Sequence, residues 1–224
     1  MTIQTHIEDA DTARLDEWLS EMPDTKSVAG FVPGPGIQKL DLKFDIMKLR
    51  EALETCLGRT EFKGDLSAGF GAFSLTRRPG VDVETPNDLS GLFFTRVDES
   101  YKEERREDVV DEFKFSEFVP AFAGTYFEHV HEELTKRFDI GRMRVLSKGL
   151  YNCNSWHRDP EPRLHIPVLT NPGSLFVVNH HVTHLPADGS VYFTDTRGYH
   201  TALNGGESNR VHIVAALPWA GSPT

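Results

Sequence analysis

The 224-residue chain has little cysteine, no long apolar run and no N-terminal targeting pattern, and each absence excludes a class of protein. Its two cysteines, Cys56 and Cys153, lie far apart in the sequence, which argues against a disulfide scaffold and makes a reducing cytoplasm the expected compartment. No run approaches the roughly 18 apolar residues of a membrane helix. No basic–apolar–small pattern predicts a signal peptide. We therefore expect a cytoplasmic protein that does not enter a membrane.

The chain also lacks an excess of positive charge, since 34 acidic and 24 basic residues give a formal net charge of −10. Duplex binding requires a basic face, so nucleic acid is not an expected partner. A hydrophobic fraction of 38% and a charged fraction of 26% are typical of a soluble globular protein. The length and the absence of repeats or a convincing linker predict a single domain over residues 1–224.

The most informative residues that are present lie between Trp156 and Arg210. His157 and Asp159 stand at positions i and i+2, and His200 follows later in the chain. In a strand, residues i and i+2 share a face, whereas a helix would set them about 200° apart. Two imidazoles and one carboxylate on one face form the facial triad of non-haem Fe(II) oxygenases. The pattern predicts a metal site at these three residues.

The flanking sequence favours strands, because short runs rich in β-branched and aromatic residues alternate with turn residues. The runs are 144–146, 163–169, 174–178, 190–194 and 211–215, and the turns include Lys148-Gly149, Asn171-Pro172-Gly173, Ala187-Asp188-Gly189 and Asn204-Gly205-Gly206. Short strands at this regular spacing indicate a barrel or sandwich. We place the core at about residues 141–218, with residues 1–140 as helical and strand support.

Several segments of the supporting part have a clear pattern and one does not. Asp9–Met22, Phe44–Leu57 and Gly124–Phe138 show apolar residues at helical spacing, and Ala68–Leu75 alternates weakly like a strand. Asp98–Asp111 is dense in charges of both signs. It predicts a solvated loop or an exposed helix, and the alternative is a mobile lid over the site.

Five stretches near the predicted metal site carry a resemblance to a known family: Trp156–Asp159, Arg163–Pro167, Tyr192–Asp195, His200–Asn204 and Asn209–His212. These stretches lie within the segment from about Arg142 to Pro218, which resembles the aspartyl/asparaginyl β-hydroxylases, a family that includes bacterial proline hydroxylases. Its members are Fe(II)/2-oxoglutarate dioxygenases. The resemblance implies a mainly β fold with flanking helices (α+β), built on a double-stranded β-helix of the jelly-roll, cupin-like type.

The resemblance also assigns roles to residues. His157, Asp159 and His200 would ligate Fe(II), and Arg210 would pair with the distal carboxylate of 2-oxoglutarate. A guanidinium suits that task because it offers two parallel charge-assisted hydrogen bonds. Arg163 and His165 would lie near the cosubstrate. His212, two residues after Arg210, lies either in the barrel or in the core.

The expected reaction is hydroxylation of an unactivated carbon by O2, coupled to decarboxylation of 2-oxoglutarate to succinate and CO2. The expected substrate is an amino acid, free or within a peptide or protein, or a related small metabolite. Two other classes stay open. A cupin-like metalloenzyme that uses no 2-oxoglutarate would need the metal ligands but not Arg210. A non-catalytic barrel would bind a ligand without turnover.

Substrate choice is expected from the rim, because loops on a rigid barrel usually supply it. Asn152, Asn154 and Trp156 precede the first metal ligand and offer hydrogen bonds and an aromatic surface. The alternative is that Trp156 belongs to the core and that the asparagines only form the turn. If the loop is only structural, the pocket is expected among Arg163, His181, His184 and Arg197.

Overall fold

The structure is a computed structural model, and it describes residues 36–67, 69–82, 85–97, 102–105, 111–178 and 181–218. Antiparallel strands dominate these residues. These residues all belong to one unit, Pro33–Thr224. The helix predicted over Asp9–Met22 lies outside the described residues, so the single domain over residues 1–224 stays a prediction. None of the described helices is long and apolar enough to cross a membrane.

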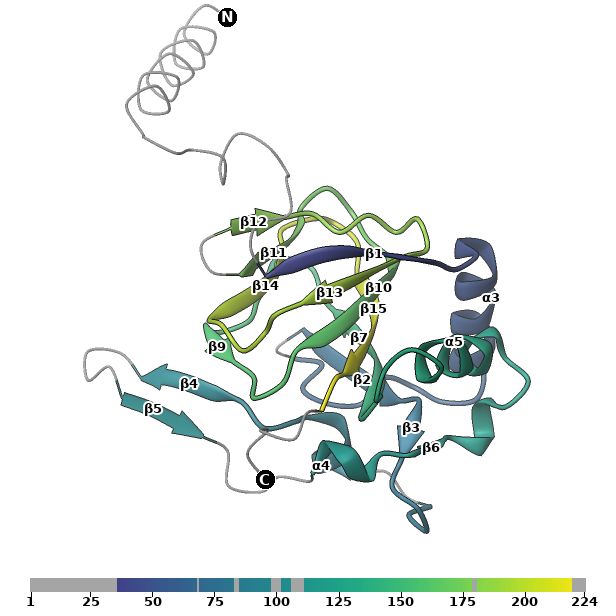
Figure 1. The fold of residues 1–224 in the computed structure, drawn as a ribbon. Coiled ribbons are helices and arrows are strands. Elements are labelled where there is room, and N and C mark those ends of the chain that lie inside the picture. Colours follow the sequence, from purple (N-terminus) through teal and green to yellow (C-terminus); the bar gives the residue numbers. More distant parts are fainter. Residues whose placement is uncertain are drawn as a thin grey trace, which may run out of the picture. The chain divides into compact units, whose positions relative to one another are not determined.

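Most strands belong to two sheets (Figure 1). In spatial order the first sheet contains β1 (Ile37–Lys43), β13 (Ser190–Thr194), β10 (Arg163–Leu169), β15 (Arg210–Ala216), β7 (Met143–Lys148) and β2 (Phe70–Ser74). The second contains β12 (His181–Thr183), β11 (Ser174–Val178), β14 (His200–Asn204), β9 (His157–Arg158), β4 (Phe94–Val97) and β5 (Lys102–Arg105), and β8 (Asn152–Cys153) also pairs with β14. A small separate sheet pairs β3 (Thr76–Arg77) with β6 (Glu117–Phe118).

From β7 onward the chain passes back and forth between the two large sheets. β7, β10, β13 and β15 lie in the first sheet, and β9, β11 and β14, which come between them in the sequence, lie in the second. This winding is that of the double-stranded β-helix, or jelly roll. The predicted fold class is therefore confirmed.

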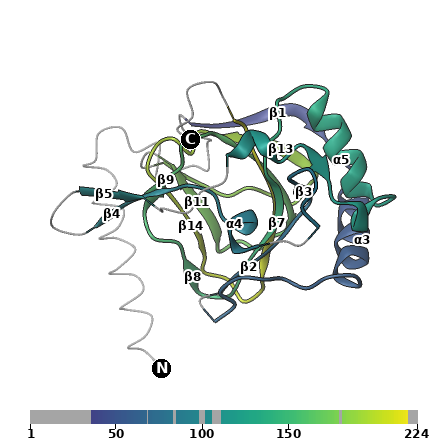
Figure 2. The same cartoon turned by 90° about the horizontal axis from the view of Figure 1, so that it is seen from below.

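Two long helices, α3 (Ile46–Leu57) and α5 (Tyr126–Thr135), cover the first sheet on one side. The short α4 (Pro86–Leu89) lies apart from them, and its Leu89 carbonyl oxygen accepts a hydrogen bond from Arg144 of β7. The structure also contains the 3-10 turns Glu112–Lys114 and Pro120–Phe122. α3 begins where the Asp45 carboxylate accepts hydrogen bonds from the backbone N–H groups of Met47 and Lys48, and it ends at Gly58. Both long helices were predicted, with slightly wider bounds. Figure 2 shows α3 and α5 on the side of the first sheet that faces away from β11 and β14.

Strand alternation gives the first sheet two different faces. On β10, Leu164, Ile166 and Val168 belong to the apolar core that packs against the helices, as do Val211, Ile213 and Ala215 on β15. The intervening positions include six polar residues, whose side chains lie between the two sheets. They are Arg163 and His165 on β10, Arg210 and His212 on β15, and Arg144 and Lys148 on β7. The interior of the barrel is therefore basic.

The charged segment Asp98–Asp111 differs from its prediction where it is described. Lys102–Arg105 is strand β5, paired with β4, so the expected loop or exposed helix is wrong for these residues. β5 is the last strand on its side of the second sheet, and Glu104 and Arg105 are exposed. An edge strand tolerates charged side chains because one side of it faces water. Sequence pattern alone does not separate such a strand from a solvated loop.

Candidate functional site

Neighbouring strands of the second sheet bring three predicted metal ligands together. His157 on β9 and His200 on β14 are direct partners in the strand register, and Asp159 follows β9. One ligand atom from each of the three residues lies within 4.8 Å of the others. The His200 Nε2 and Asp159 Oδ2 atoms are 3.4 Å apart, and the two imidazole centroids are 4.3 Å apart. The strand geometry thus converts an i, i+2 pair and a residue some forty positions later into one cluster.

The backbone fixes both imidazoles in one orientation. His157 Nδ1 lies 2.7 Å from the Ser155 carbonyl oxygen, and His200 Nδ1 lies 3.0 Å from that of Gly198. Since a carbonyl oxygen only accepts, each Nδ1 carries a proton, and Nε2 is the nitrogen of each ring that is placed to bind a metal. Burial lowers the pKa of His200 to about 4, against an opposing effect of Asp159, so this imidazole is neutral at pH 7. Neutral, oriented imidazoles are what a divalent metal requires.

The carboxylate of Asp159 is satisfied on one oxygen only. Its Oδ1 atom forms an ion pair with Arg163 at 3.0 Å. Its Oδ2 atom is buried and has no hydrogen-bond partner among the described residues. Leaving such an atom unsatisfied is costly, and a cation beside it would remove the cost. Two imidazole nitrogens and one free carboxylate oxygen match the donor set of Fe(II), so these residues fit the predicted metal.

Arg163, which the resemblance placed near the cosubstrate, is engaged with protein carboxylates. Its Nη2 atom contacts Asp159 and also Glu161, at 3.2 Å from Oε1. Glu161 is 1% exposed, and burial raises the pKa of its carboxyl to about 7. Nearby, Arg142 pairs with Glu112 at 3.0 Å. Arg163 therefore holds a metal-ligand candidate in place.

Arg210 has a different environment. It is 5% exposed, and the described residues place no carboxylate at ion-pair distance from it. Its Nη2 atom lies 2.9 Å from His212 Nδ1, and that atom lies 3.5 Å from His165 Nδ1. Burial lowers the pKa of Arg210 to about 10. A buried guanidinium that lacks a carboxylate partner can accept one from a ligand.

Lys148 is a second buried cation beside Arg210. The two residues are register partners on β7 and β15, and burial together with the charge of Arg210 lowers the pKa of Lys148 to about 8. The Lys148 ammonium donates to the side-chain oxygens of Asn152, at 2.8 Å, and of Asn154. Both asparagines, predicted as substrate residues, are thus tied to the barrel wall. Asn154 in addition lines a pocket.

That pocket, of about 270 Å³, opens beside the metal-ligand candidates. Its lining combines apolar, hydrogen-bonding and charged side chains: Phe70, Ser90, Gly91, Phe93, Arg144, Leu146, Asn154, Ser155, His157, Asp159 and Arg163. Of the residues predicted to line the substrate pocket, Asn154 and Arg163 are among them. Trp156 is 51% exposed, which is incompatible with the core alternative. Arg197 is exposed and forms an ion pair with Asp195 at 2.7 Å.

The structure also places two other rim candidates, and several residues near the site were not predicted. His184 Nδ1 lies 2.9 Å from the Ser174 carbonyl oxygen, and His181 is a half-buried residue of β12. The sequence reasoning did not single out Arg144, Lys148 or Glu161. For the first two a signal existed, because they alternate with Met143, Val145 and Ser147 along β7 and so belong to the inner face.

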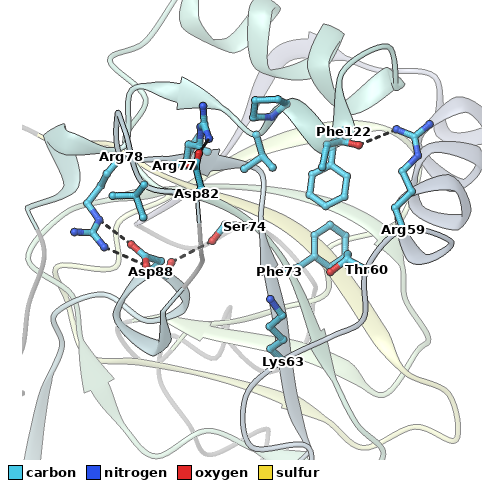
Figure 3. Close-up of a pocket in the computed structure, with 15 residues that line it drawn as sticks. Arg59, Thr60, Lys63, Phe73, Ser74, Arg77, Arg78, Asp82, Asp88 and Phe122 are labelled. Atoms are coloured by element: carbon cyan, nitrogen blue, oxygen red, sulfur yellow. Dashed lines mark hydrogen bonds and ion pairs between the residues drawn. The ribbon is translucent and has the colours of Figure 1, made fainter.

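A second cavity, of about 580 Å³, lies away from the cluster and is lined by residues of β2, β3 and the segment around Phe122 (Figure 3). Two of its cations form ion pairs within its own wall. Arg78 pairs with Asp88 at 2.9 Å, and Arg77 pairs with Asp82 at 3.0 Å. It contains none of the three metal-ligand candidates.

Comparisons with known proteins agree with the fold. No family model matches the chain. No curated protein sequence matches it either. An oxidoreductase of the 2OG-Fe(II) oxygenase family from Burkholderia pseudomallei is similar in structure, with a TM-score of 0.50, 15% identity, and coverage of 91% of this chain and 88% of the other. A viral collagen prolyl hydroxylase from Paramecium Bursaria Chlorella virus-1 covers 84% and 97% of the two chains at 10% identity, but its TM-score of 0.46 is too low to argue from. These likenesses concern the fold.

Proposed function

We propose that this protein is an Fe(II)/2-oxoglutarate-dependent dioxygenase that hydroxylates an amino acid or a related small metabolite. The observation that carries the proposal is the cluster of His157, Asp159 and His200. Both imidazoles are oriented by backbone carbonyls, and one buried carboxylate oxygen has no hydrogen-bond partner among the described residues. A bound Fe(II) would supply oxygen activation at this cluster. Arg163 would keep the Asp159 carboxylate turned towards the metal through its contact with the other oxygen.

Arg210 supports the choice of 2-oxoglutarate as cosubstrate. It is buried on the inner face of the first sheet, which faces the second sheet with its metal-ligand candidates, and it forms no carboxylate pair in the described structure. We infer that it binds the distal carboxylate of 2-oxoglutarate, and that His165 and His212 line the same region. Burial lowers the pKa of both histidines well below 6.5, so they would be present as neutral hydrogen-bonding groups.

In the overall reaction, one oxygen atom of O2 enters a C–H bond of the substrate and the other enters succinate. The terminal carboxylate next to the keto group of 2-oxoglutarate leaves as CO2. The protein's part is to hold the reactants in place and to exclude water around them. Most of the inner-face residues are buried, as such a role requires.

The test begins with binding. Calorimetry of oxygen-free protein should give one divalent metal per chain for the wild type and loss of that metal for His200→Ala. The matched control is His184→Ala, which changes a histidine bonded to a backbone carbonyl outside the cluster. Metal-loaded wild type should then bind 2-oxoglutarate and convert it to succinate in air. If the protein binds metal but forms no succinate under any condition, the cupin-like metalloenzyme or the non-catalytic barrel is favoured. Equal metal in wild type and His200→Ala would refute the site itself.

A further inference from the structure

Arg144 is a buried cation to which the proposed reaction gives no role. It lies on the inner face of β7 and is 3% exposed. Its Nη1 atom donates to the Leu89 carbonyl oxygen, and its Nε atom has no hydrogen-bond partner in the described structure. It lines the 270 Å³ pocket together with His157 and Asp159. This guanidinium therefore lies in the wall of the pocket that the metal-ligand candidates also line.

A buried arginine with a structural role is expected to pair with a buried carboxylate, and Arg142, which directly precedes β7, is an example. Arg142 is fully buried and pairs with the Glu112 carboxylate at 3.0 Å. Arg144 is just as buried, yet the described residues offer it no carboxylate at ion-pair distance. Burial and the charges of Arg163 and Arg142 lower the pKa of Arg144 to about 9. An unpaired buried charge of this kind destabilises the ligand-free fold, and a bound anion would offset the cost.

The balance of charge inside the barrel leads to the same conclusion. Among the described residues, five basic side chains, Arg142, Arg144, Lys148, Arg163 and Arg210, lie with three carboxylates, Glu112, Asp159 and Glu161. A divalent metal would add two positive charges, and a dicarboxylate cosubstrate would remove two. These described groups would then keep an excess of positive charge, which a second anion would neutralise.

We propose that Arg144 binds a carboxylate of the primary substrate, so that the substrate is a small free acid, such as a free amino acid, and not a residue inside a protein chain. This inference rests on the proposed function. The size of the pocket suits it, because about 270 Å³ lies below the roughly 300–1,000 Å³ of pockets that hold drug-sized ligands. Phe70, Phe93 and Leu146 provide an apolar wall for the carbon skeleton, and Asn154 and Ser155 provide hydrogen-bonding groups.

The pocket is also distinct from the place inferred for the cosubstrate. Arg210 is not among its lining residues and instead contacts His212, which lies next to His165. His157 and Asp159 line the pocket, so a ligand held by Arg144 would lie next to the metal. Two separate arginines thus serve two separate carboxylates.

The first arm of the test needs no variant. Wild-type protein, metal-free and metal-loaded under nitrogen, is heated with each free L-amino acid and with the matching carboxamide. We expect one or more free acids to raise the unfolding temperature and the carboxamides to have no effect. In air, the same acids should stimulate succinate formation and gain one oxygen atom by mass. Equal responses to acid and carboxamide, or no response to any free acid, would overturn the proposal.

The second arm uses Arg144→Gln and the conservative Arg144→Lys. Loss of a bidentate charged pair should lower kcat/KM for the responding acid by roughly a hundredfold in Arg144→Gln, with partial recovery in Arg144→Lys. The affinity for 2-oxoglutarate, measured by calorimetry, should stay within about twofold of the wild type. If Arg144→Gln loses 2-oxoglutarate instead, Arg144 binds the cosubstrate and the proposal is wrong. Failure of the wild type to bind metal or 2-oxoglutarate would refute the proposed function, and the acid–carboxamide comparison on metal-free protein would still decide the role of Arg144.

Discussion

Replacing Arg210 with methionine should stabilise the ligand-free protein and weaken cosubstrate binding at the same time. The side chain is buried, and its one described hydrogen-bond contact is with His212. Burial lowers its pKa to about 10, and the difference from the ordinary value of an arginine corresponds to a cost of roughly 3 kcal/mol. A methionine of similar length would fill the space without that cost. We expect a gain in unfolding free energy of about 1–3 kcal/mol.

Binding should change in the opposite direction. A dicarboxylate that loses its buried guanidinium partner should bind more weakly by about 3–5 kcal/mol, which is a factor of roughly a hundred to a few thousand. The assays are urea unfolding of metal-free protein and calorimetry with 2-oxoglutarate on metal-loaded, oxygen-free protein. Metal stoichiometry should not change, because Arg210 is outside the three-residue cluster.

Arg163→Met is the matched control. Arg163 is paired with Asp159 and Glu161, so its removal leaves two buried carboxylates without their cation. This variant should lose about 3–5 kcal/mol of stability in the same urea assay. If Arg210→Met is destabilised to the same extent, then Arg210 has a structural partner, and the inference that it lacks a carboxylate partner is wrong. An unchanged affinity for 2-oxoglutarate would refute the inferred pairing of Arg210 with the distal carboxylate.

Three further predictions test other parts of the structure. The folded chain releases the Lys148 proton near pH 8 and the unfolded chain near pH 10.5, so wild-type stability should rise relative to that of Lys148→Met across this interval. Urea unfolding of both proteins from neutral pH to about pH 10 measures the difference. A stability difference that does not change with pH would contradict the burial of this charge. Asn154→Ala should raise the KM of an identified substrate and Asn152→Ala should not, because only Asn154 lines the pocket; equal effects would show that both act through Lys148. Asp45→Ala should cost about 0.5–2 kcal/mol by removing the cap of α3, with unchanged metal binding, and an unchanged melting temperature would contradict that cap.

Local pattern predicted those parts of the fold that depend on local chemistry. β10, β11 and β13 have the predicted bounds because runs of apolar and β-branched residues end or begin at the Asn-Pro-Gly and Asp-Gly turns. The metal-ligand candidates could be found because i, i+2 on a strand is itself a statement of geometry. β1 was not predicted, although Lys39, Asp41 and Lys43 alternate with Leu40 and Leu42 along this edge strand and so carried a strand signal.

Partners that come from distant parts of the chain could not be predicted. Glu112 and Arg142 form an ion pair although they are thirty positions apart, and no sequence pattern near either residue predicts it. Asn152 and Asn154 looked like free rim groups, but the fold places the Lys148 ammonium between them. The same limit applied to Arg163, whose pairing with Glu161 becomes evident only from the fold.

The shortness of β9 has a consequence for how long a metal would stay bound. β9 contains two residues, and its register partners are one residue of β14 and two of β4. So few ladder contacts place the segment around His157 among the parts of a domain that open most readily in amide exchange. A metal held by His157 and His200 would join this segment to β14, and opening would then require breaking a coordination bond. Metal release and exchange of the amides near His157 should therefore share one rate, so that the lifetime of the bound ion reports the local opening of a single short strand.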